Sequence, residues 1–193
     1  MKALKIIGII IIVIFLIVIS LVLFLPPHAH VERSIVINAK PAQVFNQLNS
    51  FKNFNTWSPW AALDPNTKYE YSGPETGVGA FMSWSSEDKN VGSGTQKIIE
   101  SEPDSHLKNE MTFGDFDGKA YAEFMLAPEG NATKVTWSYD GDMSGMYKIL
   151  GLIMDKMLGP QYELGLSNLK KVVESQPVET ETIPAPADST AVK

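Results

Sequence analysis

The chain has 193 residues, a formal net charge of −6 and no cysteine. This length fits one domain with accessory segments. Without cysteine there are no disulfides, thiolate metal sites or cysteine nucleophiles, and the lack of a strongly basic region argues against a nucleic-acid partner. The three histidines, His28, His30 and His106, do not have the spacing of metal ligands, so we expect no metal site and no cofactor.

Residues 1–30 are predicted to form a transmembrane anchor and a short linker. Residues 6–25 carry no charge, and twenty helical residues rise about 30 Å, the thickness of a hydrocarbon core. The run is long and ends in Pro26 and Pro27 without a small-residue cleavage site, which favours an uncleaved anchor over a cleaved signal peptide. Lys2 and Lys5 precede it, so the positive-inside rule predicts a single-pass protein with a cytoplasmic N-terminus and an extracytoplasmic domain.

Residues 31–174 are predicted to form one domain. A β-branched strand at 31–38 is followed by a helix that opens at Pro41 and by a second short helix or turn at 51–55. Turn residues then separate six further strands, which predicts an antiparallel meander. These strands are expected at 68–72, 80–86, 95–101, 105–113, 119–127 and 134–140.

The last predicted element is a long helix over residues 142–174, with Ser144 as N-cap and a kink or short break at Pro160. Its apolar residues recur at helical spacing, and its first half is apolar almost all round, which indicates burial on more than one side. It is the only predicted element large enough to cover the apolar face of a curved sheet. We therefore predict an α+β helix-grip fold. Residues 175–193 read as a disordered acidic tail.

Several segments, taken together and in order, resemble the SRPBCC superfamily, which includes START lipid-transfer domains. The nearest resemblance is to its polyketide cyclase/dehydrase and lipid-transport family. The matching segments are FNTWSPW at 54–60, YSGP at 71–74, GVGA at 77–80, Trp84, VGSG at 91–94, TKVTW at 133–137 and ELGLSNLKK at 163–171. The resemblance implies a hydrophobic cavity between the sheet and the long helix. It does not fix a function, because the superfamily includes binders, enzymes and regulators.

The candidate cavity residues are large aromatic side chains and the apolar face of the long helix, because apolar pockets are lined by rings with few polar groups. Plain core packing is the alternative for each of them. The candidates are Trp57, Trp60, Trp84, Phe113, Phe124, Trp137, Tyr139, Met146, Ile149, Leu150, Ile153 and Met157. A polar contact from Tyr139, Thr136 or Glu123 is also considered.

No catalytic constellation is visible in the sequence. His106 follows a turn and is expected to be solvated, and Asp140 and Asp142 are explained by the electrostatics of a helix start. We therefore predict a membrane-anchored domain that binds a lipid or another hydrophobic small molecule. The alternatives are a cyclase- or dehydrase-like enzyme, and a protein-interaction or stress-response module with a filled core and no ligand. The oligomeric state stays open.

Overall fold

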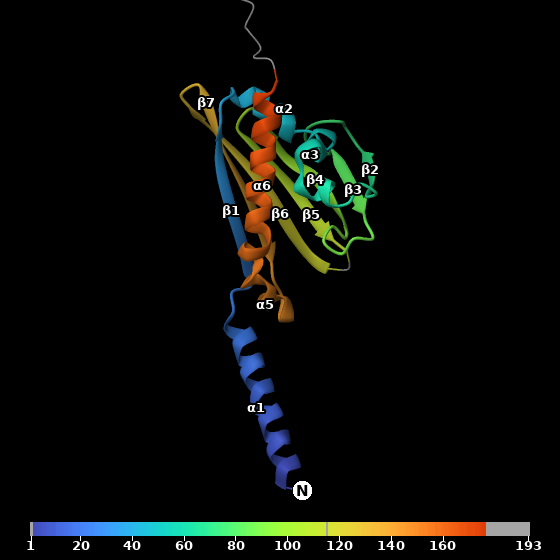
Figure 1. The fold of residues 1–193 in the computed structure, drawn as a ribbon, viewed down its shortest axis with the longest axis vertical. Helices are drawn as coiled ribbons and strands as arrows, with labels where there is room; N and C mark the ends of the chain where they lie inside the picture. Colours follow the sequence, from blue (N-terminus) through green and yellow to red (C-terminus); the bar gives the residue numbers. More distant parts are fainter. Residues whose placement is uncertain (1, 115, 177–193) are drawn as a thin grey trace, which may run out of the picture.

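The computed structural model describes residues 2–114 and 116–176 of the chain. An apolar N-terminal helix leads into an α+β domain (Figure 1). The helices are α1 (Lys2–Phe24), α2 (Pro41–Leu48), α3 (Phe51–Trp57), α4 (Pro59–Leu63), α5 (Lys148–Gly151) and α6 (Met154–Glu174), with a 3-10 turn η1 (Gly145–Tyr147). The strands are β1 (His28–Ile37), β2 (Lys68–Ser72), β3 (Phe81–Ser85), β4 (Ser93–Glu102), β5 (His106–Phe113), β6 (Phe116–Glu129) and β7 (Ala132–Asp142).

The described strands form one seven-stranded antiparallel sheet in the order β1-β7-β6-β5-β4-β3-β2. Strands β2 to β7 make the predicted meander, and β1 returns to pair with β7. Irregular register in β4 between Ile98 and Glu100, and in β5 between Met111 and Phe113, marks bulges that bend a sheet. The curved sheet and its C-terminal helix confirm the predicted helix-grip architecture, and α4 is an addition to it.

One end of the sheet lies next to the N-terminal helix. His28 at the start of β1 pairs with Asp142 at the end of β7, and along the sheet the same end contains Phe113 of β5 and Ser85 of β3. We call this the anchor end of the sheet. Figure 1 shows α1 leading away from it, and α5 beside the linker.

Helix α6 packs along the sheet next to β1 (Figure 1). Tyr162, Leu166, Leu169 and Val173 recur on its buried face. Gly165 permits the close approach, because a Cβ there would lie 2.8 Å from Cζ3 of Trp137.

An arginine on β1 holds the first half of α6 to the sheet. Arg33 donates to Asp155 Oδ1 at 2.8 Å and to Glu163 Oε1 at 2.9 Å. A Cβ at Gly159 would collide with the guanidinium group. Glycine at this position therefore lets the arginine reach both acidic residues across the helix.

The prediction of a single long helix over 142–174 was wrong for the first third of this range. The chain stays in β7 as far as Asp142, then forms η1 and α5, and α6 begins at Met154. Gly145 has φ +53°, a left-handed conformation that does not fit inside an α-helix, and Ser144 before it is extended without a side-chain cap hydrogen bond. Of the kink or short break predicted at Pro160, the break does not occur, because α6 continues through this residue. A break in the helix would cost more free energy than the hydrogen bond that Pro160 lacks, because the buried face of α6 resumes at Tyr162.

Helix α1 is, among the described residues, the one helix long and apolar enough to cross a membrane. The qualifying part, Lys5–Phe24, has a mean hydropathy of 3.7, and none of it is buried within the protein. A signal sequence would meet the same criterion. Most of the predicted tail, residues 177–193, lies outside the described residues.

Candidate functional site

A cavity of about 230 Å³ lies between the sheet, helices α3 and α4, and the first half of α6. Its lining is mostly aromatic and apolar, as expected for a small-molecule site. The lining residues are Phe54, Asn55, Ser58, Trp60, Tyr69, Met82, Trp84, Asn90, Val91, Gln96, Asn109, Met111, Phe113, Ala122, Phe124, Trp137, Tyr139, Leu158 and Tyr162.

The alternation of strand side chains builds the sheet wall of this cavity. Residues two apart on a strand face the same side. The lining accordingly takes its residues in such steps: Met82 and Trp84 from β3, Asn109, Met111 and Phe113 from β5, Ala122 and Phe124 from β6, and Trp137 and Tyr139 from β7. The helices supply the opposite wall through Phe54, Trp60, Leu158 and Tyr162.

Trp137 is the centre of the aromatic packing. Its ring stacks on Tyr162 with centroids 3.9 Å apart and planes 12° apart, and on Phe124 at 5.0 Å. Trp60 meets it edge to face at 6.0 Å. Rings held in this way are rigid, so the wall has a defined shape.

The exposed part of the cavity lining lies at the anchor end of the sheet. Only two of its described lining residues are exposed, Asn90 in the β3–β4 turn and Phe113 at the end of β5. Trp84 lies beside them, with its ring over Gly94, where a Cβ would lie 2.5 Å from the indole carbons. We call Asn90, Phe113 and Trp84 the mouth of the cavity.

Two buried polar atoms in the lining lack a hydrogen-bond partner within the part of the chain that the structure describes. They are Oδ1 of Asn109 and Nε1 of Trp137. Buried polar groups are nearly always hydrogen-bonded in folded proteins. An unpaired acceptor and an unpaired donor in one cavity are what a polar ligand group would satisfy.

None of the described residues that line the cavity carries a charge at neutral pH. The titratable groups among them are Tyr69, Tyr139 and Tyr162. Burial, the largest cause in each case, raises the pKa of all three hydroxyls above the usual value for tyrosine. The described lining is therefore electrically neutral.

The structure places six of the twelve predicted cavity residues in the lining: Trp60, Trp84, Phe113, Phe124, Trp137 and Tyr139. Trp57 is instead fully buried in the core, where it packs edge to face on Phe54 with centroids 4.8 Å apart. Its Nε1 donates to the Gln47 carbonyl at 3.3 Å.

The five predicted helix residues are not in the lining. Met146, Ile149, Leu150, Ile153 and Met157 are all exposed, in η1, in α5 and around the start of α6. The pattern was read as one continuous helix face, but the chain turns between η1 and α6. Leu158 and Tyr162, which follow, are the α6 residues that reach the cavity.

Sequence reasoning missed Asn109 and Tyr162. The strand alternation Asn109, Met111, Phe113 would have placed the asparagine on the cavity face. Of the proposed polar contacts, Tyr139 lines the cavity and Thr136 does not. Glu123 is bound by His106, whose Nε2 lies 2.6 Å from Oε1.

His106 is therefore buried against β6, and the prediction of a solvated turn histidine was wrong. Asp140 does not begin a helix either. It lies in β7 and makes hydrogen bonds with His30 Nδ1 at 2.8 Å and His28 Nε2 at 3.1 Å. Across residues 2–114 and 116–176, no group of three acidic, histidine or cysteine side chains has a geometry that would hold a metal ion.

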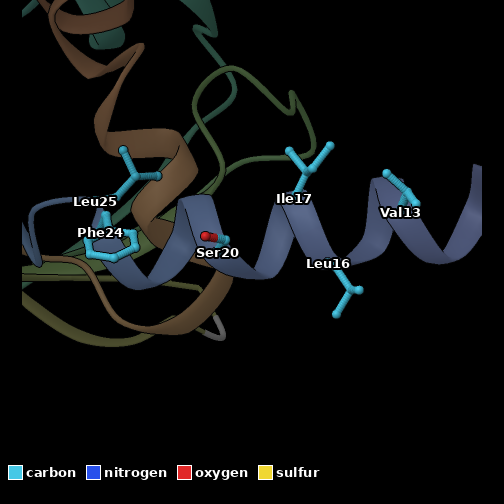
Figure 2. A pocket seen from close by; sticks show the side chains of 6 residues that line it. All are labelled: Val13, Leu16, Ile17, Ser20, Phe24 and Leu25. Carbon is cyan, nitrogen blue, oxygen red and sulfur yellow. The ribbon is translucent and has the colours of Figure 1, made fainter.

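A second concavity lies along the flank of α1 (Figure 2). It is lined by Val13, Leu16, Ile17, Ser20, Phe24 and Leu25. These side chains come from one helix and the residue after it, without a second wall of polar groups. In a bilayer, acyl chains would fill such a flank, so we do not treat it as a ligand site.

Three solved structures share the fold at low sequence identity, which shows the fold alone. Norcoclaurine synthase from Thalictrum flavum aligns with a TM-score of 0.60 and 17% identity, over 78% of this chain and 89% of that one. Protein CV1439 from Chromobacterium violaceum aligns with a TM-score of 0.57 and 16% identity, over 76% and 98%. An uncharacterized protein from Rhizobium leguminosarum aligns with a TM-score of 0.55 and 19% identity, over 77% and 96%.

No curated protein sequence is significantly similar to this chain. A family model described as polyketide cyclase / dehydrase and lipid transport matches residues 28–174, which is well over half of the chain and the whole of the helix-grip domain. The match agrees with the fold and with the resemblance found in the sequence. The chain therefore belongs to the polyketide cyclase / dehydrase and lipid transport family.

Proposed function

We propose that this protein binds an uncharged, largely apolar small molecule in the cavity of its helix-grip domain, while α1 anchors the domain to a membrane. The observation that carries the proposal is the neutral aromatic cavity with two unpartnered buried polar atoms, Trp137 Nε1 and Asn109 Oδ1. The preceding lysines, Lys2 and Lys5, favour a cytoplasmic N-terminus and an extracytoplasmic domain.

The absence of charge from the described lining selects against ionic ligands. A carboxylate, phosphate or ammonium group that entered the cavity would lose its hydration and find no opposite charge there. Burial of an unpaired ion costs several kcal/mol even after the protein relaxes. A neutral ligand avoids this cost.

The two unpartnered atoms favour a ligand with a hydroxyl group. The indole N–H of Trp137 only donates, and the amide oxygen of Asn109 accepts. Each costs about 1–3 kcal/mol while it is buried without a partner. A hydroxyl group offers both an acceptor and a donor, so its binding removes a cost that the empty cavity bears.

The cavity volume limits the size of the ligand. About 230 Å³ is below the roughly 300–1,000 Å³ of pockets for drug-sized molecules. This favours a molecule with one or two rings, or a short single chain, over a two-chain lipid. The norcoclaurine synthase structure was solved in complex with dopamine and hydroxybenzaldehyde, which are small aromatic molecules. That complex supports a ligand of this size in a cavity of the same fold.

Three naphthalene derivatives test the proposal on the full chain in lipid nanodiscs. Calorimetric titration should show 2-naphthol binding most tightly, naphthalene more weakly because it lacks the hydroxyl, and the carboxylate 2-naphthoate not measurably. Ala122→Leu, which fills part of the cavity, is the matched control for partition into lipid. Equal heats for this variant and the unmodified chain, or tighter binding of 2-naphthoate than of 2-naphthol, would contradict the proposal.

Two variants locate the polar contact. Trp137→Phe removes the N–H, and Asn109→Leu removes the amide. Each substitution should weaken the binding of 2-naphthol by about 5- to 100-fold, the range of one buried hydrogen bond. The affinity for naphthalene should change much less. Equal losses for both compounds would mean that these residues only shape the cavity.

The two alternatives receive less support. A protein-interaction module with a filled core does not account for the cavity. A cyclase- or dehydrase-like enzyme that needs a general base would find only tyrosines in the described lining, and their raised pKa keeps them protonated. The topology is tested by fusing alkaline phosphatase after Lys193. Activity is expected only if the C-terminus lies outside the cytoplasm, and an inactive fusion would reverse the orientation.

A further inference from the structure

Six large aliphatic or methionine side chains lie exposed between β7 and the second turn of α6, together with the ring of Tyr147. They are Met146, Ile149, Leu150, Leu152, Ile153 and Met157, and their exposed fractions run from 37% to 62%. We call these six residues the apolar ledge. The sequence pattern marked most of them as buried, yet nothing in the described domain covers them. A cluster of exposed aliphatic side chains on a small domain usually marks an interaction surface.

The apolar ledge is fixed next to the point where the chain leaves α1. The backbone N–H of Met143 donates to the Pro27 carbonyl at 2.8 Å, and a Cβ on Gly151 would meet Ala29 Cβ at 3.8 Å. Figure 1 shows α5 beside this linker, and in Figure 2 the ribbon of the same region runs close to Phe24 and Leu25. Pro27 is three residues beyond the end of α1, and three extended residues span only about 10 Å.

That distance places the ledge at the depth of lipid headgroups whenever α1 crosses a bilayer. Segments that lie in this interface bury apolar side chains about 5–10 Å into the headgroup and acyl boundary. They also place lysines where the ammonium group can reach the headgroups. Lys148 and Lys156 lie within the ledge segment, whereas the nearby carboxylate of Asp155 is held by Arg33 on the domain side.

A protein partner fits the ledge less well than lipid does. Protein interfaces take about 20–30 residues from each side, and their binding energy concentrates in tryptophan, tyrosine and arginine. The ledge has six residues, all aliphatic or methionine, and Tyr147 is the single exposed aromatic side chain among residues 143–157. Because the linker is short, a bilayer would be beside the ledge at all times, while a protein partner would have to compete with it.

We propose that the apolar ledge inserts into the lipid leaflet from which α1 emerges, and thereby holds the mouth of the cavity against the membrane surface. The mouth residues Asn90, Phe113 and Trp84 lie at the same anchor end of the sheet as the ledge. An apolar ligand dissolved in the bilayer would then reach the cavity along a short path. The inference rests on the proposed anchoring by α1, and the experiment below separates the two.

The chain has no cysteine, so single cysteines report one site at a time. Leu150→Cys and Ile153→Cys place an environment-sensitive NBD label on the ledge. Glu129→Cys labels the opposite end of the sheet, and Ile12→Cys labels the middle of α1. All four positions are exposed, so the labelled chains should fold, and their circular dichroism melts should match that of the unmodified chain. Each full chain is reconstituted in phosphatidylcholine vesicles, with or without nitroxide-bearing lipids.

The labels on the ledge should emit at shorter wavelength and lose at least about half of their fluorescence to lipids with a shallow nitroxide. The Glu129→Cys label should respond only to aqueous iodide, and the Ile12→Cys label to a deep nitroxide. Ledge labels that behave like the Glu129→Cys label, while the α1 label is quenched, would overturn the inference and leave the anchor intact. A shift to shorter wavelength without lipid quenching would also overturn it, in favour of a second copy of the chain. An α1 label unquenched by lipid would overturn both proposals.

Discussion

The cavity makes a sharp prediction for one buried alanine. Ala122 on β6 lines the cavity and is 3% exposed, while Ala120, two residues earlier on the same face of the same strand, is 0% exposed and does not line it. Ala122→Leu should therefore extend into empty space, whereas Ala120→Leu should overpack the core.

The size of the effect follows from the three carbon atoms that leucine adds. At about 0.8 kcal/mol per buried methylene they contribute at most about 2.4 kcal/mol. The lost rotamer freedom of leucine, about 0.5–1 kcal/mol, leaves a net stabilisation of about 1–2 kcal/mol. Ala120→Leu should instead destabilise by about 1–3 kcal/mol, the usual range for extra atoms in a packed core.

Thermal unfolding of the full chain, followed by circular dichroism, measures both changes. For a chain of this size 1 kcal/mol shifts Tm by about 2–4 °C, so Ala122→Leu should raise Tm by roughly 2–8 °C and Ala120→Leu should lower it. The same Ala122→Leu chain should lose most of its 2-naphthol binding. A decrease in Tm for Ala122→Leu as large as that for Ala120→Leu would refute the cavity, and the binding proposal with it.

Three other substitutions follow from the contacts of α5, α6 and β1. Ile153→Ala should cost less than about 1 kcal/mol in chemical unfolding, because the residue is exposed and does not belong to the core; a loss of 2–5 kcal/mol would show that it is packed. Gly165→Ala should destabilise by up to about 2 kcal/mol, because overpacking against Trp137 outweighs a gain of about 1 kcal/mol in helix propensity. Its control, Gly151→Ala, meets only ordinary contacts at 3.8 Å and should not destabilise. Arg33, by hydrogen bonding, lowers the pKa of Asp155 below its usual 3.8, so this ion pair stabilises above about pH 4 and fades as the pH falls through the lowered value. The Tm difference between Arg33→Met and the unmodified chain should therefore shrink from pH 7 to pH 2, and a constant difference would contradict it.

The order of the elements was predictable because its signals are local. Alternation in residues such as Val135, Trp137 and Tyr139 identifies a half-buried strand, and Pro41 marks a helix start without tertiary information. An order of seven strands with short turns and a final helix is compatible with few folds. This part of the prediction was right.

The start of the last helix was not predictable in the same way. A run of apolar residues at helical spacing indicates burial. The predicted cavity residues of this run are nevertheless exposed, because Gly145 takes a left-handed conformation and the chain turns before α6 begins. Periodicity reports that a face is apolar without reporting what covers it. If α1 crosses a membrane, as we propose, lipid is a second apolar environment, and the pattern does not distinguish it from the core.

The polar half of the candidate site was also hidden in the sequence. Asn109 is one of several asparagines, and its significance lies in an unpaired amide oxygen that is buried in the same cavity lining as an unpaired indole N–H. Whether a polar atom is satisfied depends on every neighbour in three dimensions. Composition and spacing do not contain that information.

The three tyrosines of the cavity make the binding of an uncharged ligand independent of pH. Burial raises the pKa of Tyr69, Tyr139 and Tyr162, so within the described lining no group changes its charge between about pH 4 and pH 9. Affinity for 2-naphthol should then stay flat across this range. Acidification within this range would therefore not release the bound ligand. Occupancy would follow the concentration of the free molecule alone, as in a passive reservoir that fills and empties with its surroundings.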